Sequence, residues 1–226
     1  AIRGALIVAP KGVYKNWHDI EMPVHLPDHV EHTKVLWEPT TTKKKQIDLD
    51  TLFDDKGDLK ILIMNVEAFS TAKGLDFAER FLNIFVGKAL IGIDESTTIK
   101  SPTAQRTRNI LKIGTLASYR RILTGSPVTK SPLDLYTQCL FLDKYHLGIE
   151  SYYSYKQRYA NIEKRYFGGR TVELVTSYRR LDELAEKLDA FSYRVLKEDC
   201  LDLPPKVFTT RIVELSKEQK EKYAMM

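Results

Sequence analysis

Cysteine is scarce in this chain of 226 residues, which contains only Cys139 and Cys200. Neither belongs to a Cys-x-x-Cys pair, so the sequence predicts no disulfide framework and no zinc site, and we expect both thiols to be buried. The five histidines also lack a metal-binding arrangement, because Pro23 and Pro27 disfavour a regular helix where two of them have i, i+4 spacing.

Long apolar runs are absent as well. No stretch approaches the roughly 20 apolar residues that a membrane span needs, and the apolar part of the N-terminal AIRGALIVAP is too short for a signal peptide before Lys11. Hydrophobic residues make up 43% and charged residues 29%, which is typical of a globular domain. We therefore expect a soluble intracellular protein with no membrane partner.

Positive charge is concentrated in one segment of the chain. The net charge is +5, and residues 151–180 contain seven basic residues against only Glu163 and Glu173, so the rest of the chain is neutral. A basic segment in a neutral background attracts a phosphate backbone. A solvated helix face is the alternative interpretation.

Short, continuous apolar runs recur along the first 125 residues, at 5–9, 61–64, 89–93 and 121–123, with a weaker run at 35–37. Continuous hydrophobicity is typical of strands buried on both faces of a parallel sheet. Segments of helical length separate these runs, so the pattern predicts an α/β fold with helices flanking a parallel sheet.

Helix starts are predicted after two of these strands. Ser101 with Pro102, and Ser131 with Pro132, have the cap and first-turn residues of a helix N-terminus. Polar residues then fall at the carboxyl ends of strands, where open α/β sheets bind their ligands.

The pattern changes after residue 143. We expect a helix over 151–166 that ends at Gly168 and Gly169, a short strand at 171–175 and a helix at 181–188, together forming a helical appendage over 144–200. Residues 1–143 would be the main lobe. Residues 201–226 would be a Pro-Pro connector into a strand at 207–215, followed by a helix with the capping box of Ser216 and Gln219.

Two adjacent acids, Asp94 and Glu95, end the apolar strand of the segment LIGIDESTTIKSP at 90–102. Paired acids suit nucleotide hydrolysis, because the first can hold Mg²⁺ while the second orients and deprotonates the attacking water. Loop starts favour acids for structural reasons too, so the pair alone is a weak signal.

A Thr-Gly-Ser-Pro turn ends another strand, in RRILTGSPVTKSPLDLY at 120–136. The hydroxyls of Thr124 and Ser126, on either side of Gly125, could hydrogen-bond carboxylates on the neighbouring strand and sense the state of a nucleotide. A plain Gly-Pro turn is the structural alternative.

Four blocks in this order resemble the Swi/Snf-type translocases of the superfamily-two helicases. ALIVAPKGVYKNWHDIE (5–21) resembles motif Ia, ILIMNVEAFS (61–70) the region of motif Ib, IDESTTIK (93–100) motif II, and ILTGSP with LDLY (122–136) motif III. Residues 191–223 resemble the stretch between the two motor lobes. The resemblance implies a RecA-like lobe of the P-loop NTPase type, which binds ATP and Mg²⁺ and works with a second RecA-like lobe on double-stranded DNA.

The resemblance also implies roles for individual residues. Asp94 and Glu95 would be the magnesium-associated and water-activating acids, and Thr124, Gly125 and Ser126 would couple hydrolysis to movement. Three residues after the first strand, Pro10, Lys11 and Asn16, would lie near the tracked DNA strand together with Trp17. A core position for Trp17 and a merely exposed Lys11 are the alternatives.

The sequence departs from the family pattern at three places. Ser96 and Thr97 stand where the family usually has Ala-His, and Lys130 stands where it commonly has Asn. No GxxxxGK[ST] loop occurs, so the backbone cradle and lysine for the phosphates are missing. We expect this chain alone to bind ATP weakly without hydrolysing it, and we expect a divergent source: the cytoplasm of a bacterium or virus-infected host, or a nucleus if eukaryotic.

Half of the twelve tyrosines lie between residues 151 and 180, among the basic residues. Aromatic and basic side chains together can contact the sugar-phosphate backbone or stack on bases, although a tyrosine stripe on a helix is more often core packing. We hypothesise that four residues there contact duplex DNA: Lys156, Arg158, Lys164 and Arg165.

Two rival functions stay open at this point. An RNA helicase of the same superfamily is disfavoured, because the LTGSP turn and the LDLPPK connector resemble the DNA-translocating branch. A non-catalytic DNA-binding or scaffold domain with a RecA-like fold is disfavoured by the presence of both Asp94 and Glu95.

Overall fold

The computed structural model describes residues 1–39, 42–54, 58–196, 200 and 207–225. Residues Ala1–Phe191 form one compact unit and Ser192–Met226 a second one. No helix within the described ranges is long and apolar enough to cross a membrane.

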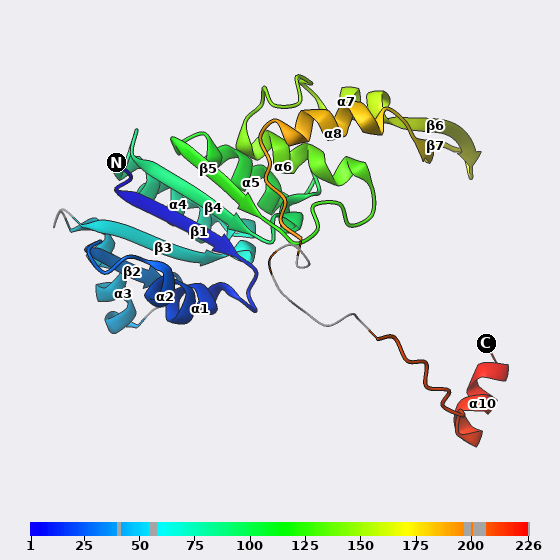
Figure 1. Ribbon diagram of the computed structural model, residues 1–226, viewed down its shortest axis with the longest axis horizontal. Helices are drawn as coiled ribbons and strands as arrows, with labels where there is room; N and C mark the ends of the chain where they lie inside the picture. The colour runs from blue at the N-terminus through cyan, green and yellow to red at the C-terminus, as the bar shows by residue number, and fades with distance from the viewer. Residues whose placement is uncertain (40–41, 55–57, 197–199, 201–206, 226) are drawn as a thin grey trace. The chain divides into compact units, whose positions relative to one another are not determined.

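Five parallel strands form the central sheet of the first unit (Figure 1). They are β1 (Gly4–Ala9), β2 (His32–Leu36), β3 (Leu59–Asn65), β4 (Ala89–Asp94) and β5 (Tyr119–Leu123), in the spatial order β2-β3-β1-β4-β5. All four strand pairs are parallel. The predicted α/β class and the predicted strands of the central sheet are confirmed, since a parallel sheet is flanked by helices.

Alternate residues of the central strands enter two different cores. Leu6 and Val8 pack with η3 (Val66–Ser70), α4 (Ala72–Ile84), α5 (Gln105–Gly114) and α6 (Leu135–Leu142). Ala5 and Ile7 pack against the segment on the opposite face, formed by α1 (Tyr14–Asn16), the π-helical turn η1 (Trp17–Glu21) and α2 (Met22–His25). Both faces of β1 are therefore buried, which explains its continuous apolar sequence.

The edges of the sheet are less covered. Beside β2 lie α3 (Lys43–Asp50) and the 3-10 turn η2 (Thr51–Phe53). At the other edge, β4 is the only strand within the described ranges that pairs with β5, whose Tyr119 and Leu123 side chains are 44% and 48% exposed. The α1–α2 segment thus leaves one face of β5 open.

Helix α5 begins later than the sequence predicts. Its first residue is Gln105, and Ser101 instead opens a turn in which its carbonyl accepts the Ala104 N–H at 3.3 Å. The predicted start at Pro132 is confirmed, because Pro132 opens the 3-10 turn η5 (Pro132–Asp134) that leads into α6. The Ser131 side chain forms no capping hydrogen bond there.

The predicted helix over 151–166 is wrong in its second half. Helix α7 (Tyr152–Tyr159) ends at residue 159, and β6 (Ala160–Phe167) pairs antiparallel with β7 (Arg170–Tyr178). Gly168 and Gly169 have φ values of +52° and +85° and form the two-residue turn of this hairpin. The appendage is therefore a helix, a hairpin and a helix, ending in α8 (Leu181–Asp189).

Two expectations for the C-terminal residues are also corrected. Residues 207–215 form no strand, because no strand within the described ranges pairs with them, whereas the capping box of Ser216 and Gln219 is confirmed at the start of α10 (Lys217–Ala224).

Cys139 is buried as expected, and burial raises the pKa of its thiol to about 12. Cys200 is exposed, contrary to the expectation.

Gly74 in the first turn of α4 gives a test of the packing between this helix and η3. A Cβ atom there would lie 2.3 Å from the Ala68 carbonyl oxygen. We predict that Gly74→Ala lowers the free energy of unfolding by about 1–3 kcal/mol, although alanine is the better helix former by about 1 kcal/mol. Urea unfolding measures the effect. Gly12→Ala is the control, because its Cβ would meet nothing within 4 Å, and equal effects of both substitutions would refute the argument.

Candidate active site at the carboxyl edge of the sheet

The two predicted acids lie where β4 ends. Asp94 is the last residue of the strand, and Glu95 has a left-handed backbone with φ 49° and ψ 59°. A non-glycine residue in this region is strained, and such strain is concentrated at functional sites. The left-handed residue turns the chain from β4 into the 3-10 turn η4 (Ser96–Ile99), and Glu95 is exposed.

Both carboxylate oxygens of Asp94 accept a hydrogen bond. The indole N–H of Trp17 donates to Oδ2 at 2.9 Å, and the backbone N–H of Glu95 donates to Oδ1 at 2.9 Å. Trp17 opens η1, whose π-helical bond runs from the Met22 N–H to the Trp17 carbonyl. Such turns are rare in proteins, and those that occur often lie at functional sites. The two bonds fix the orientation of the carboxylate and leave a free lone pair on each oxygen.

The Thr-Gly-Ser turn after β5 lies beside Glu95. The Thr124 hydroxyl donates to the Glu95 carboxylate at 3.5 Å, and it accepts the Ser126 N–H at 3.2 Å. The Ser126 hydroxyl donates to the Val128 carbonyl at 3.0 Å. The structure thus brings together Glu95 and Thr124, as the sequence predicts, whereas Ser126 supports the turn rather than the acids.

A buried polar network joins the acid loop to α6. Ser96 is fully buried and donates to Gln138 Oε1 at 2.6 Å, and Gln138 Nε2 donates to the carbonyls of Pro127 and Asp134 at 2.8 and 2.7 Å. Thr137, also fully buried, donates to the Ile99 carbonyl at 2.6 Å. Because buried polar groups are costly without partners, this network holds η4 against α6.

Asp134 organises the loop between the Thr-Gly-Ser turn and α6. Its Oδ2 accepts the backbone N–H groups of Thr129 and Lys130 at 3.1 and 2.9 Å and the Thr129 hydroxyl at 2.8 Å. Burial raises the pKa of the Asp134 carboxyl, but these hydrogen bonds and the nearby Lys100 outweigh it and lower the pKa below its usual value. Lys130 therefore contributes its backbone N–H here.

The residues predicted to face DNA after β1 have mixed surroundings. The Pro10 carbonyl accepts the N–H groups of Val13 and Tyr14 at 2.9 and 3.0 Å, which starts α1. Asn16 donates to Glu21 at 2.9 Å. Lys11 is exposed and forms no ion pair with any residue that the structure describes. Since β1 and β4 are parallel neighbours, this loop lies at the same edge of the sheet as Asp94.

The four basic residues of the appendage divide into two pairs. On α7, Lys156 bonds Glu173 at 2.9 Å, and Arg158 holds both carboxylate oxygens of Glu183 at 2.7 Å. On β6, Lys164 and Arg165 are exposed. The helix they were expected to share is absent, because the chain changes from α7 to β6 at Ala160.

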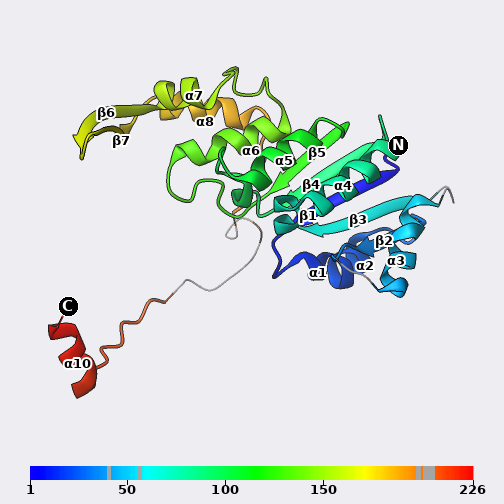
Figure 2. The ribbon, with the colours of Figure 1, turned by 180° about the vertical axis from the view of Figure 1, so that it is seen from behind.

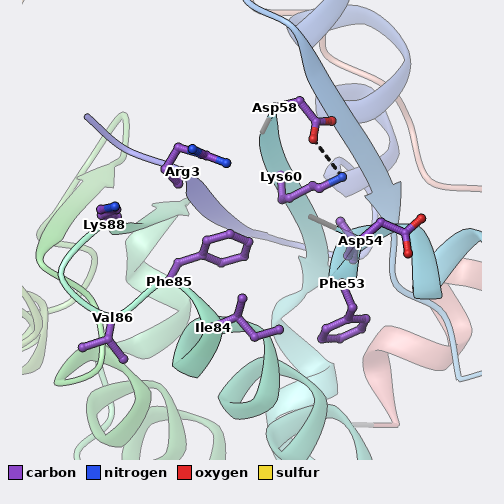
Figure 3. A pocket seen from close by; sticks show the side chains of 10 residues that line it. Arg3, Phe53, Asp54, Asp58, Lys60, Ile84, Phe85, Val86 and Lys88 are labelled. Carbon is purple, nitrogen blue, oxygen red and sulfur yellow. Dashed lines mark ion pairs between the residues drawn. The ribbon is translucent and has the colours of Figure 1, made fainter. Parts of the chain in front are cut away.

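A cavity of about 370 Å³ lies at the opposite, amino end of the strands (Figure 3). It is lined by Arg3, Lys60 and Phe85 among others, and the buried Lys60 pairs with Asp58 at 2.9 Å. Open α/β sheets bind ligands at the carboxyl ends of their strands, so this cavity is not the candidate active site.

The Asp94 carboxylate suits a magnesium ion whose other ligands are water molecules and substrate phosphates. Within the described ranges no three His, Cys, Asp or Glu side chains form a cluster that could hold a metal ion. Mg²⁺ commonly binds one or two carboxylates together with substrate phosphates and waters. The oriented carboxylate of Asp94, with its free lone pairs, suits that role.

Several residues of this site escaped the sequence analysis. Trp17 was assigned to DNA or the core rather than to Asp94, and Ser96 was noted only as a departure. Asp134 carried no signal, because the groups that it binds lie in the loop before α6. A polar pair inside the apolar run LYTQCLFL was the one available hint.

Residues 2–226 match the SNF2-related domain. The chain belongs to the SNF2-related domain family. This SNF2-related domain is 37% identical over 118 residues to the mouse DNA annealing helicase and endonuclease ZRANB3, covering 51% of the chain and 11% of that protein. It is 31% identical over 134 residues to the yeast TATA-binding protein-associated factor MOT1, covering 58% of the chain and 7% of that protein.

A solved structure is also similar to this SNF2-related domain. It is the Sulfolobus solfataricus SWI2/SNF2 ATPase core in complex with dsDNA, with a TM-score of 0.48 and 20% sequence identity. The match covers 70% of this chain and 28% of that one. The chain therefore spans a small part of the proteins that it resembles.

Asp134 makes the stability of the loop depend on pH. We predict that Asp134→Asn lowers the free energy of unfolding at neutral pH by about 1–3 kcal/mol, because one oxygen loses charge-assisted bonds from three donors. The folded pKa is lowered, so the wild-type advantage is present above the ordinary pKa of about 3.9 and is lost as the pH falls through the folded value.

Chemical unfolding at pH 7 and at pH 3 measures this difference. Asp28→Asn is the matched control, because it removes the same charge from an exposed side chain. A stability difference that persists unchanged at the lower pH would contradict the assignment.

Proposed function

We propose that this chain is the first motor lobe of an ATP-dependent translocase that moves along double-stranded DNA. The observation that carries the proposal is the contact between Glu95, at the end of β4, and Thr124, at the end of β5, inside an SNF2-related domain. A water-activating acid that touches the turn of the neighbouring strand links hydrolysis at one loop to movement of another.

ATP and Mg²⁺ are the proposed ligands of the carboxyl edge. Asp94 would hold the ion directly or through water, and the bound ion would neutralise charge on the transferred phosphoryl group. Glu95 would orient the attacking water and accept its proton. The hydrogen bond from Thr124 to Glu95 would make the position of the Thr-Gly-Ser turn depend on the position and charge of the Glu95 carboxylate.

The phosphates need a cradle that these 226 residues lack, since no GxxxxGK[ST] loop occurs. We propose that the loop belongs to a strand outside these residues that pairs with the open edge of β5. The exposed Tyr119 and Leu123 side chains support this position, because a further strand and its helix would cover them. A second RecA-like lobe would complete the ATP site.

The DNA strand is proposed to lie along the loop after β1. Lys11 supports this, because it is exposed at the carboxyl edge and forms no ion pair within the described ranges. Pro10 and Asn16 shape the loop through their hydrogen bonds, and Trp17 connects the same segment to Asp94. DNA contact at this loop would therefore change the orientation of the Asp94 carboxylate through its hydrogen bond with Trp17.

The test is ATP hydrolysis by the longest natural protein that contains this chain. We expect duplex DNA to stimulate turnover more than single strands or RNA, and Glu95→Gln to abolish turnover while leaving duplex binding intact. Stimulation by RNA alone would assign an RNA helicase. An absence of hydrolysis under every condition would leave a DNA-binding or scaffold domain.

Trp17→Phe tests the link between the DNA loop and Asp94. The substitution removes the indole N–H and keeps an aromatic ring, so Asp94 loses one orienting bond. Outer-sphere partners of metal ligands are typically worth about 10- to 100-fold in metal affinity or activity. We expect a loss in that range in a Mg²⁺ titration of DNA-stimulated turnover.

Trp37→Phe is the control for this experiment, because it makes the same change at a buried core position. If both substitutions alter the Mg²⁺ dependence equally, Trp17 acts through general packing and its role at Asp94 is refuted.

A further inference from the structure

The distal half of the β6–β7 hairpin extends past α7 and α8 in both views (Figures 1 and 2). The pairing continues to the last residues before the turn, Phe167 opposite Arg170. An isolated two-stranded hairpin is at best marginally stable in water. The hairpin is therefore stabilised by the contacts between its base and the rest of the lobe.

Several interactions fix that base. The ion pair of Lys156 with Glu173 joins β7 to α7, and Arg179 donates to the Gln157 carbonyl at 2.6 Å. Val175 packs against the core cluster that contains the fully buried Tyr155 and Tyr159. The proximal half of the ribbon is thus attached to the body of the lobe, which would let the distal half resist force.

The tip carries two exposed aromatic side chains. Tyr166 is 74% exposed and Phe167 is 57% exposed. Consecutive residues of a strand point to opposite faces, so one ring lies on each face of the ribbon, directly before the Gly168–Gly169 turn. Exposed apolar surface at a projecting tip is typical of a binding site.

The charge around these rings is positive. Residues 164–172 contain Lys164, Arg165 and Arg170 and no acidic residue. Arg165 pairs with Glu163 at 3.2 Å in an exposed contact. Lys164 lies opposite Glu173 in the ladder, and the pKa of that carboxyl is lowered by the hydrogen bond from Lys156 and also by the Lys164 charge. Arg170 forms no ion pair with any described residue. Positive charge beside exposed aromatic rings fits a nucleic acid, whose bases stack and whose phosphates need cations.

We propose that the hairpin tip is a wedge that binds the junction between duplex and single-stranded DNA. Tyr166 and Phe167 stack on bases on the two sides of the ribbon, and Lys164 and Arg170 contact the flanking phosphates. A ribbon that reads a groove presents one polar face to the base edges, whereas this tip has an aromatic ring on each face. The inference rests on the proposed function, since it assumes that the motor acts on DNA.

A shortened hairpin tests the wedge without removing its base. Deleting residues 166–167 and 170–171 leaves Arg165, Gly168, Gly169 and Val172 as the new tip. Removal of two residue pairs preserves the alternation of the antiparallel ladder and the faces of the remaining side chains. The pair of Lys156 and Glu173 is retained.

The double substitution Tyr166→Leu with Phe167→Leu provides a second variant with an intact backbone. Tyr153→Leu is its control, because Tyr153 is 62% exposed on α7 and lies away from the tip. Thermal unfolding of each variant confirms that the fold is intact.

Equilibrium binding is measured with the intact natural protein, without nucleotide, on a forked duplex and on a blunt duplex of the same paired length. We expect the wild type and Tyr153→Leu to prefer the fork. Both tip variants should lose about tenfold in affinity for the fork, the order expected from loss of base stacking, and change by less than about twofold on the blunt duplex.

Two results would overturn the wedge: no fork preference in the wild type, or a fork preference that survives in both tip variants. The outcome is separable from the proposed function, which fails if duplex DNA does not stimulate ATP hydrolysis by the intact protein. Binding and stimulation by blunt duplex without any effect of the tip would reject this inference alone.

Discussion

Parallel pairing of the central strands is the constraint on which the candidate site depends. Because β1, β4 and β5 run in the same direction, their carboxyl ends meet at one edge of the sheet. Trp17, Asp94 and Thr124 are far apart in sequence, yet each follows or ends one of these strands. The hydrogen bonds from Trp17 to Asp94 and from Thr124 to Glu95 exist only because of this register.

A buried polar network then holds the loops in place. Ser96 and Gln138 are both fully buried, and a missing partner would leave polar atoms without hydrogen bonds in a low-dielectric environment. The network ties the loop after β4 to the helix after β5. The loop that carries the acids and the loop that carries the Thr-Gly-Ser turn are therefore joined through Gln138, an arrangement that suits the proposed motor lobe.

The basic segment that stands out in the sequence has two roles in the fold. Lys156 and Arg158 are engaged by Glu173 and Glu183, so their charge serves to assemble the appendage. Lys164 and Arg170 lie on the projecting hairpin, and of these two Arg170 forms no ion pair within the described ranges. Composition shows the excess of charge, but only pairing distances show which cations are free.

The strands, the acids and the Thr-Gly-Ser turn could be predicted because their signals are local. Buried parallel strands need continuous apolar runs, and β1 and β4 have them. The helix expected over 151–166 failed at Ala160, because residues 160–167 gain more from pairing with 170–178 than from helical bonds, and a segment read alone does not show this partner. The two glycines at 168–169 were a hairpin signal that was read only as a helix end.

The α/β class, the order of the motifs and the residue types able to perform the chemistry follow from local patterns in the sequence. Which of these residues meet depends on the three-dimensional fold: Trp17 donates to Asp94, Ser96 has a buried partner in Gln138, and the hairpin presents an aromatic ring on each face. Such contacts depend on strand register and on helix packing across the sheet. Those are set by burial of the whole core rather than by any one segment.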